Sequence, residues 1–228
     1  MGLYPQAWPR FVNRPPIYKG FLFDFDGVLS DSECFTWPIV QRVLTQFGLA
    51  QVEHQKDVGG WTWQAIAELV SESRAVDPTL LADVCATAFQ KKVLEEPRSI
   101  PGAREALNFA SKLGAVAIVT GSRVDVVRRW LEHFSLHDCV DTIVAAGMYR
   151  RAKPDPECYR MALDRLALKP GDGLVFEDSN AGIQAAASAH LSVVAIANGQ
   201  PRGEHIRRLI TTEFDSFIPL LDTFFRVV

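Results

Sequence analysis

The chain has 228 residues, 48% of them hydrophobic and 22% charged, which is enough to bury one ordinary core or one core with an inserted subdomain. Its formal net charge is −3 and it has no dense block of lysine or arginine, so binding to nucleic acid or to anionic lipid is disfavoured. The four cysteines lie far apart without a CxxC pair, which predicts neither a zinc knuckle nor a disulfide framework and favours a reducing, cytoplasmic compartment.

Residues 1–18, MGLYPQAWPRFVNRPPIY, are rich in proline and aromatic side chains and predict an irregular N-terminal arm. This start of the chain lacks the apolar core of a signal peptide. No apolar run in the sequence reaches the roughly 18 residues that a membrane span requires. We therefore expect no membrane segment.

Short apolar runs further along the chain predict buried strands, because each is short and bounded by turn residues. These runs are GFLFDF (20–25), AVAIVT (115–120), DTIVAA (141–146), GLVFED (173–178) and LSVVAIA (191–197). The segments between most of them have apolar residues spaced by three and four, which is typical of helices. Alternation of strand and helix predicts an α/β fold, a Rossmann-like core with a parallel sheet.

The gap between the first two predicted strands breaks this alternation. It contains three helical patterns and no convincing strand, so residues 31–99 are predicted to form an inserted helical cap. The catalytic core then comprises residues 19–30 and 100–228. Pro101 is expected to open the next helix, and the tail SFIPLLDTFFRVV to form a short closing helix.

Polar residues follow four of the predicted strands, where ligands bind in open parallel sheets. They are Asp24 and Asp26 after the first strand, Thr120, Gly121 and Ser122 after the second, Lys153 after the third, and Glu177 and Asp178 after the fourth. Carboxylates that converge at one edge would repel one another unless a hard cation lay among them. Magnesium prefers such oxygen ligands, and a lysine would supply further positive charge.

The segment after the second strand has the features of an anion site. Thr120 and Ser122 offer hydroxyl groups, and the amides around Gly121 precede a predicted helix, whose start favours a bound phosphate. Gly27, directly after the two aspartates, allows a sharp turn and a close approach of the backbone to the ligand.

Taken in order, the four segments DFDGVLSDSE, IVTGS, KPDP and EDSNAG resemble the motifs of the haloacid dehalogenase superfamily of phosphohydrolases, over residues 20 to 200. The resemblance implies that Asp24 is a nucleophile that forms an aspartyl-phosphate, and that Asp26 is the general acid and base. It implies that Thr120 binds the phosphoryl oxygens and that Lys153 neutralises the nucleophile and the transferring group.

The resemblance also implies a magnesium ion. Its ligands would be the carboxylates of Asp24 and Asp178 and the backbone carbonyl of Asp26, with Glu177 as a supporting acidic partner. The insertion resembles the helical cap of the subgroup that includes beta-phosphoglucomutase and many sugar-phosphate and phosphoglycolate phosphatases.

These features predict a magnesium-dependent phosphatase acting on a small phosphorylated metabolite, such as a sugar phosphate. A phosphomutase like beta-phosphoglucomutase is the first alternative, because the core residues would be the same. A non-catalytic binding protein on the same scaffold is the second. The chain is expected to be a monomer or a weak homodimer.

The first and third segments each have a structural alternative. Asp24 and Asp26 could end a strand and accept hydrogen bonds from a turn. Lys153, which precedes Pro154, could be an exposed loop lysine.

The second and fourth segments could instead serve as helix caps. Thr120 with Ser122 could cap the helix that follows them. Glu177 with Asp178 could do the same for the next one, where acidic residues are favourable. Asn180 could either hydrogen-bond Asp178 or cap that helix.

Two further patterns lie outside these segments. DVGGWTWQAI places Gly60 and Trp61 where a loop could close over the substrate, although packing of Trp61 and Trp63 within the cap is the favoured alternative. Trp61 and Thr62 also depart from the arginine or serine that commonly follows the glycine in this subgroup. His133 and His137 are four residues apart, but no partner acid has the metalloprotease spacing, so they are interpreted as solvated helix residues.

Overall fold

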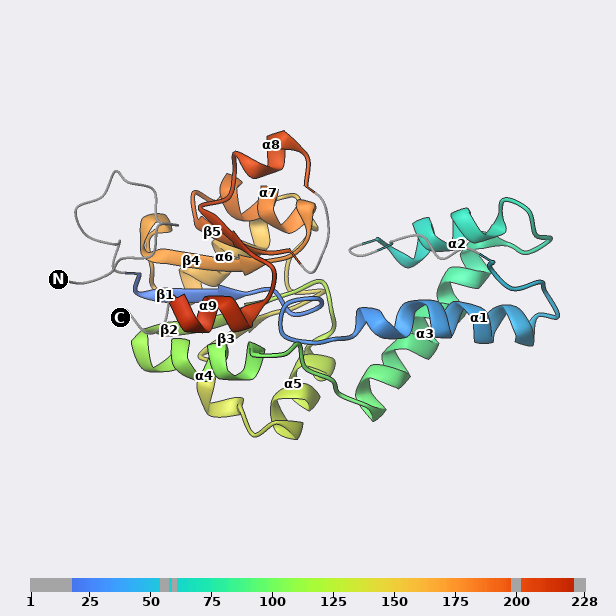
Figure 1. Ribbon diagram of the computed structural model, residues 1–228, viewed down its shortest axis with the longest axis horizontal. Coiled ribbons are helices and arrows are strands. Elements are labelled where there is room, and N and C mark those ends of the chain that lie inside the picture. Colours follow the sequence, from blue (N-terminus) through green and yellow to red (C-terminus); the bar gives the residue numbers. More distant parts are fainter. Residues whose placement is uncertain (1–17, 54–57, 59–60, 198–201, 224–228) are drawn as a thin grey trace. The chain divides into compact units, whose positions relative to one another are not determined.

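The computed structural model describes residues 18–53, 58, 61–197 and 202–223 (Figure 1). The predicted N-terminal arm lies outside the described residues except for Tyr18. The chain divides into two compact units: a helical unit, Asp31–Arg98, and a core unit made of the segments before and after it. No helix among the described residues is both long enough and apolar enough to cross a membrane.

The core unit is built on a six-stranded parallel sheet in the order β3-β2-β1-β4-β5-β6. The strands are β1 (Gly20–Phe23), β2 (Ala115–Val119), β3 (Thr142–Val144), β4 (Gly173–Glu177), β5 (Ser192–Ile196) and β6 (Thr212–Phe214). The predicted α/β fold with a parallel sheet is confirmed. The strand β6 was not predicted, because its sequence TEF is short and has no apolar run.

Helices on both faces bury the central strands, which are apolar along their length except at Glu177, the last residue of β4. The helices of this unit are α4 (Ala103–Leu113), α5 (Val124–His133), α6 (Glu157–Arg165), α7 (Asn180–Ser188), α8 (Glu204–Arg207) and α9 (Phe217–Thr223), with short 3-10 turns at His137–Cys139 and Pro170–Asp172. On one face, Leu22 and Val175 belong to a buried cluster with residues of α6 and α7. On the other, the rings of Phe23 and Phe176 stack at 4.5 Å, and Phe217 of α9 packs beside both.

Helix α4 starts later than the sequence predicted. Pro101 was expected to open this helix, but the first helical residue is Ala103, and Gly102 occupies the N-cap position with a φ of 81°. A side chain at Gly102 would meet Phe217 Cβ at 3.0 Å. The left-handed backbone and the close approach of α9 both require glycine at this position.

The two segments of the core unit that flank the helical unit are hydrogen-bonded to each other. Ser30 and Ser99 form an antiparallel bridge, and the Ile100 amide donates to the Leu29 carbonyl at 3.1 Å. The two ends of the insertion therefore leave the core side by side.

The helical unit consists of a 3-10 turn at Glu33–Phe35 and the helices α1 (Thr36–Gln46), α2 (Trp63–Ser71) and α3 (Pro78–Glu95). Thr62 caps α2 by accepting from the Ala65 amide at 3.2 Å, and Asp77 caps α3 by accepting from Thr79 at 2.9 Å. The described residues of this unit contain no strand.

Candidate active site

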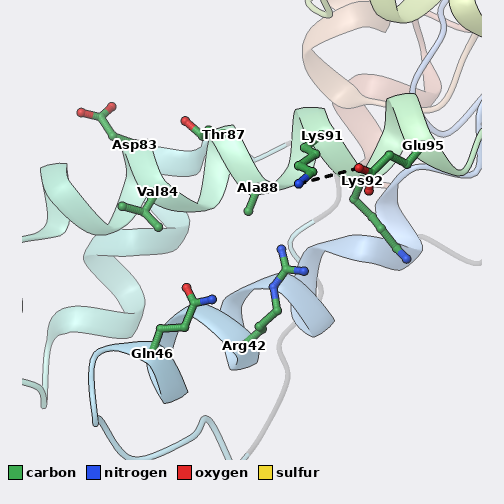
Figure 2. A pocket seen from close by; sticks show the side chains of 9 residues that line it. All are labelled: Arg42, Gln46, Asp83, Val84, Thr87, Ala88, Lys91, Lys92 and Glu95. Atoms are coloured by element: carbon green, nitrogen blue, oxygen red, sulfur yellow. Dashed lines mark ion pairs between the residues drawn. The ribbon is translucent and has the colours of Figure 1, made fainter.

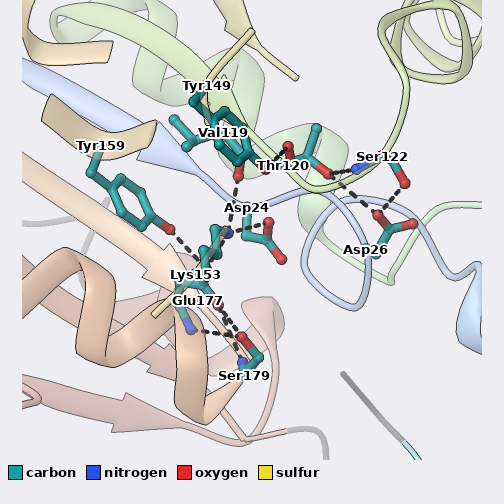
Figure 3. Close-up of polar contacts among 11 residues, drawn as sticks. Asp24, Asp26, Val119, Thr120, Ser122, Tyr149, Lys153, Tyr159, Glu177 and Ser179 are labelled. Carbon is teal, nitrogen blue, oxygen red and sulfur yellow. Dashed lines mark hydrogen bonds and ion pairs between the residues drawn. The ribbon is translucent and has the colours of Figure 1, made fainter. Parts of the chain in front are cut away.

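The predicted site residues of the core unit meet at the carboxyl ends of its central strands (Figure 3). Asp24 directly follows β1, Thr120 directly follows β2, and Glu177 ends β4 with Asp178 next. Backbone hydrogen bonds continue past the strand ends, with Asp24 N donating to Phe176 O and Thr120 N to Val144 O. These bonds fix the backbone from which the polar side chains project.

Lys153 joins two of these carboxylates. Its ammonium group lies 2.7 Å from Asp24 Oδ1, 2.5 Å from Glu177 Oε1 and 3.1 Å from the Val119 carbonyl. Burial lowers the pKa of Lys153, but the charges of Asp24 and Glu177 outweigh it and hold that pKa well above its ordinary value. Lys153 is therefore a charged group of the site and not an exposed loop lysine.

Asp24 is in an environment that opposes its ionisation. Burial raises the pKa of Asp24 to about 8, with Glu177 and Asp26 adding to the rise and Lys153 opposing it. In the metal-free site, the carboxyl group is therefore mostly protonated at neutral pH. A cation placed beside it would favour the ionised form.

Three buried carboxylates could hold such a cation. Each of Asp24, Glu177 and Asp178 offers an oxygen, and these oxygens lie within 4.8 Å of one another. The oxygens of Glu177 already accept hydrogen bonds from Lys153, from the Tyr159 hydroxyl, and from the Ser179 amide and hydroxyl groups. This arrangement fits Glu177 as a supporting residue rather than as the principal ligand.

Asp26 turns toward the segment after β2. Its Oδ2 accepts from Ser122 Oγ at 2.6 Å and from Thr120 Oγ1 at 3.3 Å. Thr120 Oγ1 in turn accepts from the Ser122 amide at 2.8 Å, and the N-cap of α5, Arg123, makes no side-chain cap. Thr120 and Ser122 are thus bound to Asp26, and the capping interpretation of this segment is not what the structure shows.

Gly121 lies between these two residues and is exposed. A Cβ atom built on it would have no neighbour within 4 Å. Within the part of the chain that the structure describes, Gly121 therefore has no partner near its Cα side that would test the predicted phosphate-binding role, and that role stays a prediction.

Two glycines allow the acidic groups to be packed closely. Gly27 has a φ of 76°, and a Cβ there would lie 1.9 Å from Asp178 Oδ2. A Cβ on Gly182 would lie 1.8 Å from Glu177 Oε1. Gly27 was predicted to allow a sharp turn and a close approach of the backbone to the ligand. Its positive φ fits the turn, and the group that approaches it in the structure is the carboxylate of Asp178.

We expect Gly182→Ala to lower the free energy of unfolding by about 3 kcal/mol, since the added methyl group overlaps a buried carboxylate that cannot move aside freely. Urea denaturation would measure this loss. The matched control is Gly171→Ala, whose added Cβ meets no atom within 4 Å and which should change stability by less than about 0.5 kcal/mol. Equal effects of the two substitutions would contradict the packing argument.

Sequence reasoning missed two tyrosines and a serine near the site. Tyr149 donates to the Thr120 carbonyl at 3.0 Å, and Tyr159 donates to Glu177 Oε1 at 2.7 Å. Ser179 is the N-cap of α7 and accepts from the Gly182 amide at 3.0 Å. A signal for Tyr159 was available, because it lies on the apolar face of its helix and a buried hydroxyl needs a polar partner.

Of the two roles expected for Asn180, the helix cap is contradicted, and a hydrogen bond to Asp178 stays a prediction. Because Ser179 takes the N-cap position, Asn180 is the first helical residue, and its Oδ1 accepts from Arg202 at 3.4 Å. Arg202 is a buried arginine that also donates to Glu213 at 2.7 Å and to the Ile196 carbonyl at 3.0 Å. It ties α7 to β5 and β6.

In the helical unit, the predicted site residue Gly60 lies outside the described residues. Trp61 is 48% exposed, whereas Trp63 packs edge-on against Phe89 with ring centroids 5.3 Å apart. The packing interpretation therefore holds for Trp63, and a role for Trp61 in substrate binding stays a prediction.

The histidine pair lies in the core unit. His133 packs edge-on against the adjacent Phe134 ring, and His137 lies 3.1 Å from Asp138. Among the residues that the structure describes, the two histidines do not belong to a metal-ligating group.

The helical unit contains a groove of about 530 Å³ between α1 and α3. Figure 2 shows Arg42 and Gln46 of α1 facing α3 across it. The other lining residues are Asp83, Val84, Thr87, Ala88, Lys91, Lys92 and Glu95. The groove includes none of the motif residues.

The core unit has a parallel sheet, an aspartate after a central strand that is ion-paired with a lysine, and an acidic cluster beside it. These features are those of a phosphohydrolase-like α/β protein. The chain belongs to the haloacid dehalogenase-like hydrolase family, whose sequence profile matches residues 21–196. The superfamily predicted from the four motifs is thereby confirmed.

Curated relatives of the chain are phosphatases. The phosphorylated carbohydrates phosphatase of Thermotoga maritima is 32% identical over 182 residues, which cover 75% of this chain and 81% of that protein. The fructose-1-phosphate phosphatase YqaB of Escherichia coli is 28% identical, with 78% and 96% covered. These relatives support the prediction of a phosphoric monoester hydrolase.

Solved structures share the fold. A Thermotoga maritima structure, provisionally named a beta-phosphoglucomutase, is similar with a TM-score of 0.77 and 24% identity, over 92% of this chain and 100% of that one. The structure of CbbY from Rhodobacter sphaeroides gives a TM-score of 0.69 at 22% identity, with 89% and 96% covered.

Proposed function

We propose that the protein is a magnesium-dependent phosphatase that hydrolyses a small phosphorylated metabolite, such as a sugar phosphate, through an aspartyl-phosphate on Asp24. The observation that carries this proposal is the Lys153 ammonium group, which bridges Asp24 and Glu177 beside Asp178. The names of the curated relatives, which include phosphatases of phosphorylated carbohydrates and of fructose 1-phosphate, support the substrate class.

In this mechanism, an oxygen of Asp24 forms a bond to phosphorus while the bond from phosphorus to the ester oxygen breaks. Asp26, in its acid form, gives its proton to the departing oxygen. Water then attacks the phosphorus of the aspartyl-phosphate and Asp26 takes up the proton, which releases inorganic phosphate and restores Asp24. The ammonium group of Lys153 offsets negative charge on the nucleophile and on the transferring group.

The donor set fits magnesium. All candidate ligands are oxygens, and the carboxylates, once ionised beside a single ammonium group, would carry an excess of negative charge that a divalent cation would offset. Asp24, Asp178 and the Asp26 carbonyl would hold the ion, and Glu177 would support them. When bound, the ion supplies charge neutralisation at the phosphoryl oxygens.

We further propose that the helical unit, residues 31–98, acts as the cap that selects the ester, with Trp61 contacting the leaving group. A cytoplasmic location and a monomeric or weakly dimeric state remain predictions from the sequence.

Magnesium binding should release protons at neutral pH. The pKa of Asp24 is about 8 in the metal-free site, and a bound cation would lower it, so the carboxyl group must lose its proton on binding. The apparent magnesium affinity should therefore rise with pH up to about 8 and then level off. Titration calorimetry in buffers of different ionisation enthalpy would measure the released protons. No proton release at pH 7 would contradict the assignment of Asp24 as a ligand.

A panel of phosphate esters, assayed for inorganic phosphate with magnesium and again with excess EDTA, tests the proposal. Magnesium-dependent release from a sugar phosphate supports it. Isomerisation of a sugar phosphate primed by a bisphosphate, without phosphate release, would instead identify a mutase. A wild-type protein that binds these esters and turns none of them over would identify a binding protein.

A further inference from the structure

Tyr159 contacts two of the charged groups in the proposed active site and is itself closed off from solvent. It lies on α6 and is fully buried. Its hydroxyl donates to Glu177 Oε1 at 2.7 Å, and the centroid of its ring lies 5.1 Å from Lys153 Nζ. Figure 3 shows the Tyr159 side chain pointing toward Lys153 and Glu177 from the side away from Asp26.

The position of the Lys153 ammonium group depends on its acceptors. A lysine side chain is a flexible four-carbon stem, so it holds one position only when its N–H groups are fixed. Three acceptors do this here: Asp24 Oδ1, Glu177 Oε1 and the Val119 carbonyl. The carbonyl is held by the sheet, but a glutamate carboxylate rotates easily about its last bond.

Each oxygen of Glu177 has its own protein partners. Oε2 accepts from the amide and hydroxyl groups of Ser179, while Oε1 accepts from Lys153 and Tyr159. Among the described residues, Oε1 of Glu177 thus has hydrogen bonds from Lys153 and from Tyr159, and the bond from Tyr159 helps to fix its position. Its ring adds a cation–π contact with the same ammonium group.

We infer that Tyr159 is a positioning residue of this enzyme: through Glu177 Oε1 and through its ring, it holds the Lys153 ammonium group in its place 2.7 Å from Asp24 Oδ1. The inference rests on the proposed phosphatase function and adds to it. Because its side chain is fully buried, we expect Tyr159 to act through Lys153 and Glu177 and not by touching substrate. Its effect should appear in the transition state, where the charge that Lys153 offsets is greatest.

Tyr159→Phe tests the inference, because it keeps the ring and removes only the hydroxyl. We expect kcat for the best ester to fall about tenfold with KM changed less than about twofold. With magnesium present, binding of orthovanadate, a mimic of the five-coordinate transition state, should weaken about tenfold. Binding of inorganic phosphate should change less than about twofold.

Tyr18→Phe is the matched control. Tyr18 is also buried in the core unit, and its hydroxyl has a side-chain hydrogen bond with Ser192, which begins β5 at the opposite end of the strands from the site. This substitution should leave kcat, KM and both inhibitor affinities unchanged. Both variants are assayed below their melting temperatures, with kcat expressed per phosphate-binding site so that unfolded protein does not count.

The outcomes separate the inference from the function on which it rests. If wild-type protein hydrolyses esters and Tyr159→Phe behaves like Tyr18→Phe, or loses phosphate and vanadate binding equally, the positioning role is overturned and the phosphatase stands. If wild-type protein hydrolyses no ester, the proposed function fails, and the vanadate-to-phosphate affinity ratio of the two variants still decides the role of Tyr159.

Discussion

Asp24→Asn should lower kcat for phosphate release by about four orders of magnitude or more, because an amide cannot serve as the nucleophile. The same substitution should not unfold the protein. The introduced asparagine side chain is isosteric and can still accept a hydrogen bond from Lys153, and it cannot acquire the negative charge that an ionised Asp24 would place beside Glu177 and Asp26. Phosphate release from the best ester and thermal unfolding in EDTA would measure the two effects.

The difference in stability between Asp24→Asn and wild type should change with pH in one direction. The pKa of Asp24 is raised from 3.8 to about 8 by burial, so the folded state increasingly disfavours the wild-type side chain as pH rises through this range. The melting temperature of Asp24→Asn relative to wild type should therefore increase between pH 5 and pH 8 in the absence of metal. Asp164→Asn, on the exposed face of α6, is the control for the loss of a carboxylate. It should change neither kcat for phosphate release nor the pH dependence of the melting temperature. Activity retained in Asp24→Asn would exclude the nucleophile assignment.

Lys153→Met is expected to have the largest effect on stability. It leaves Asp24 and Glu177 buried without their shared positive partner, and breaking a buried pair in this way typically costs about 3–5 kcal/mol. Lys153 also lowers the pKa of Asp24, so without it the carboxyl group stays protonated to higher pH. Urea denaturation in EDTA should therefore show a larger loss at pH 8.5 than at pH 6.

The control for this substitution is Lys112→Met near the exposed end of α4, which removes the same charge from the surface and should cost less than about 0.5 kcal/mol at either pH. A loss for Lys153→Met that is equally small, or that shrinks as pH rises, would show that the buried ion pairs do not hold the site together.

The strands and their polar termini could be predicted because both depend on local sequence. A buried parallel strand is a short apolar run, and the topology of a parallel sheet brings the residues that follow such runs to one edge. This reasoning located Asp24, Thr120 and Glu177. It missed β6, since an edge strand with the sequence TEF has no apolar pattern to detect.

Contacts that depend on how a helix is rotated against the sheet could not be predicted in this way. The bond from Tyr159 to Glu177 exists because α6 presents that side chain to the end of β4. The N-cap of α7 is Ser179, one residue before Asn180. Both residue types are good caps, so the sequence alone does not decide between them. The close packing of Gly182 against Glu177 likewise follows from tertiary structure alone.

The bridge between Ser30 and Ser99 has a consequence for the evolution of the chain. Because Ser30 and Ser99 pair with each other, the segment between them has adjacent ends and can be exchanged as a module. If the helical unit selects the ester as proposed, a lineage could lengthen, shorten or replace that module and so change which ester is accepted, while every strand carrying the proposed reacting groups kept its register. Substrate range and chemistry would then evolve under separate constraints within a single polypeptide.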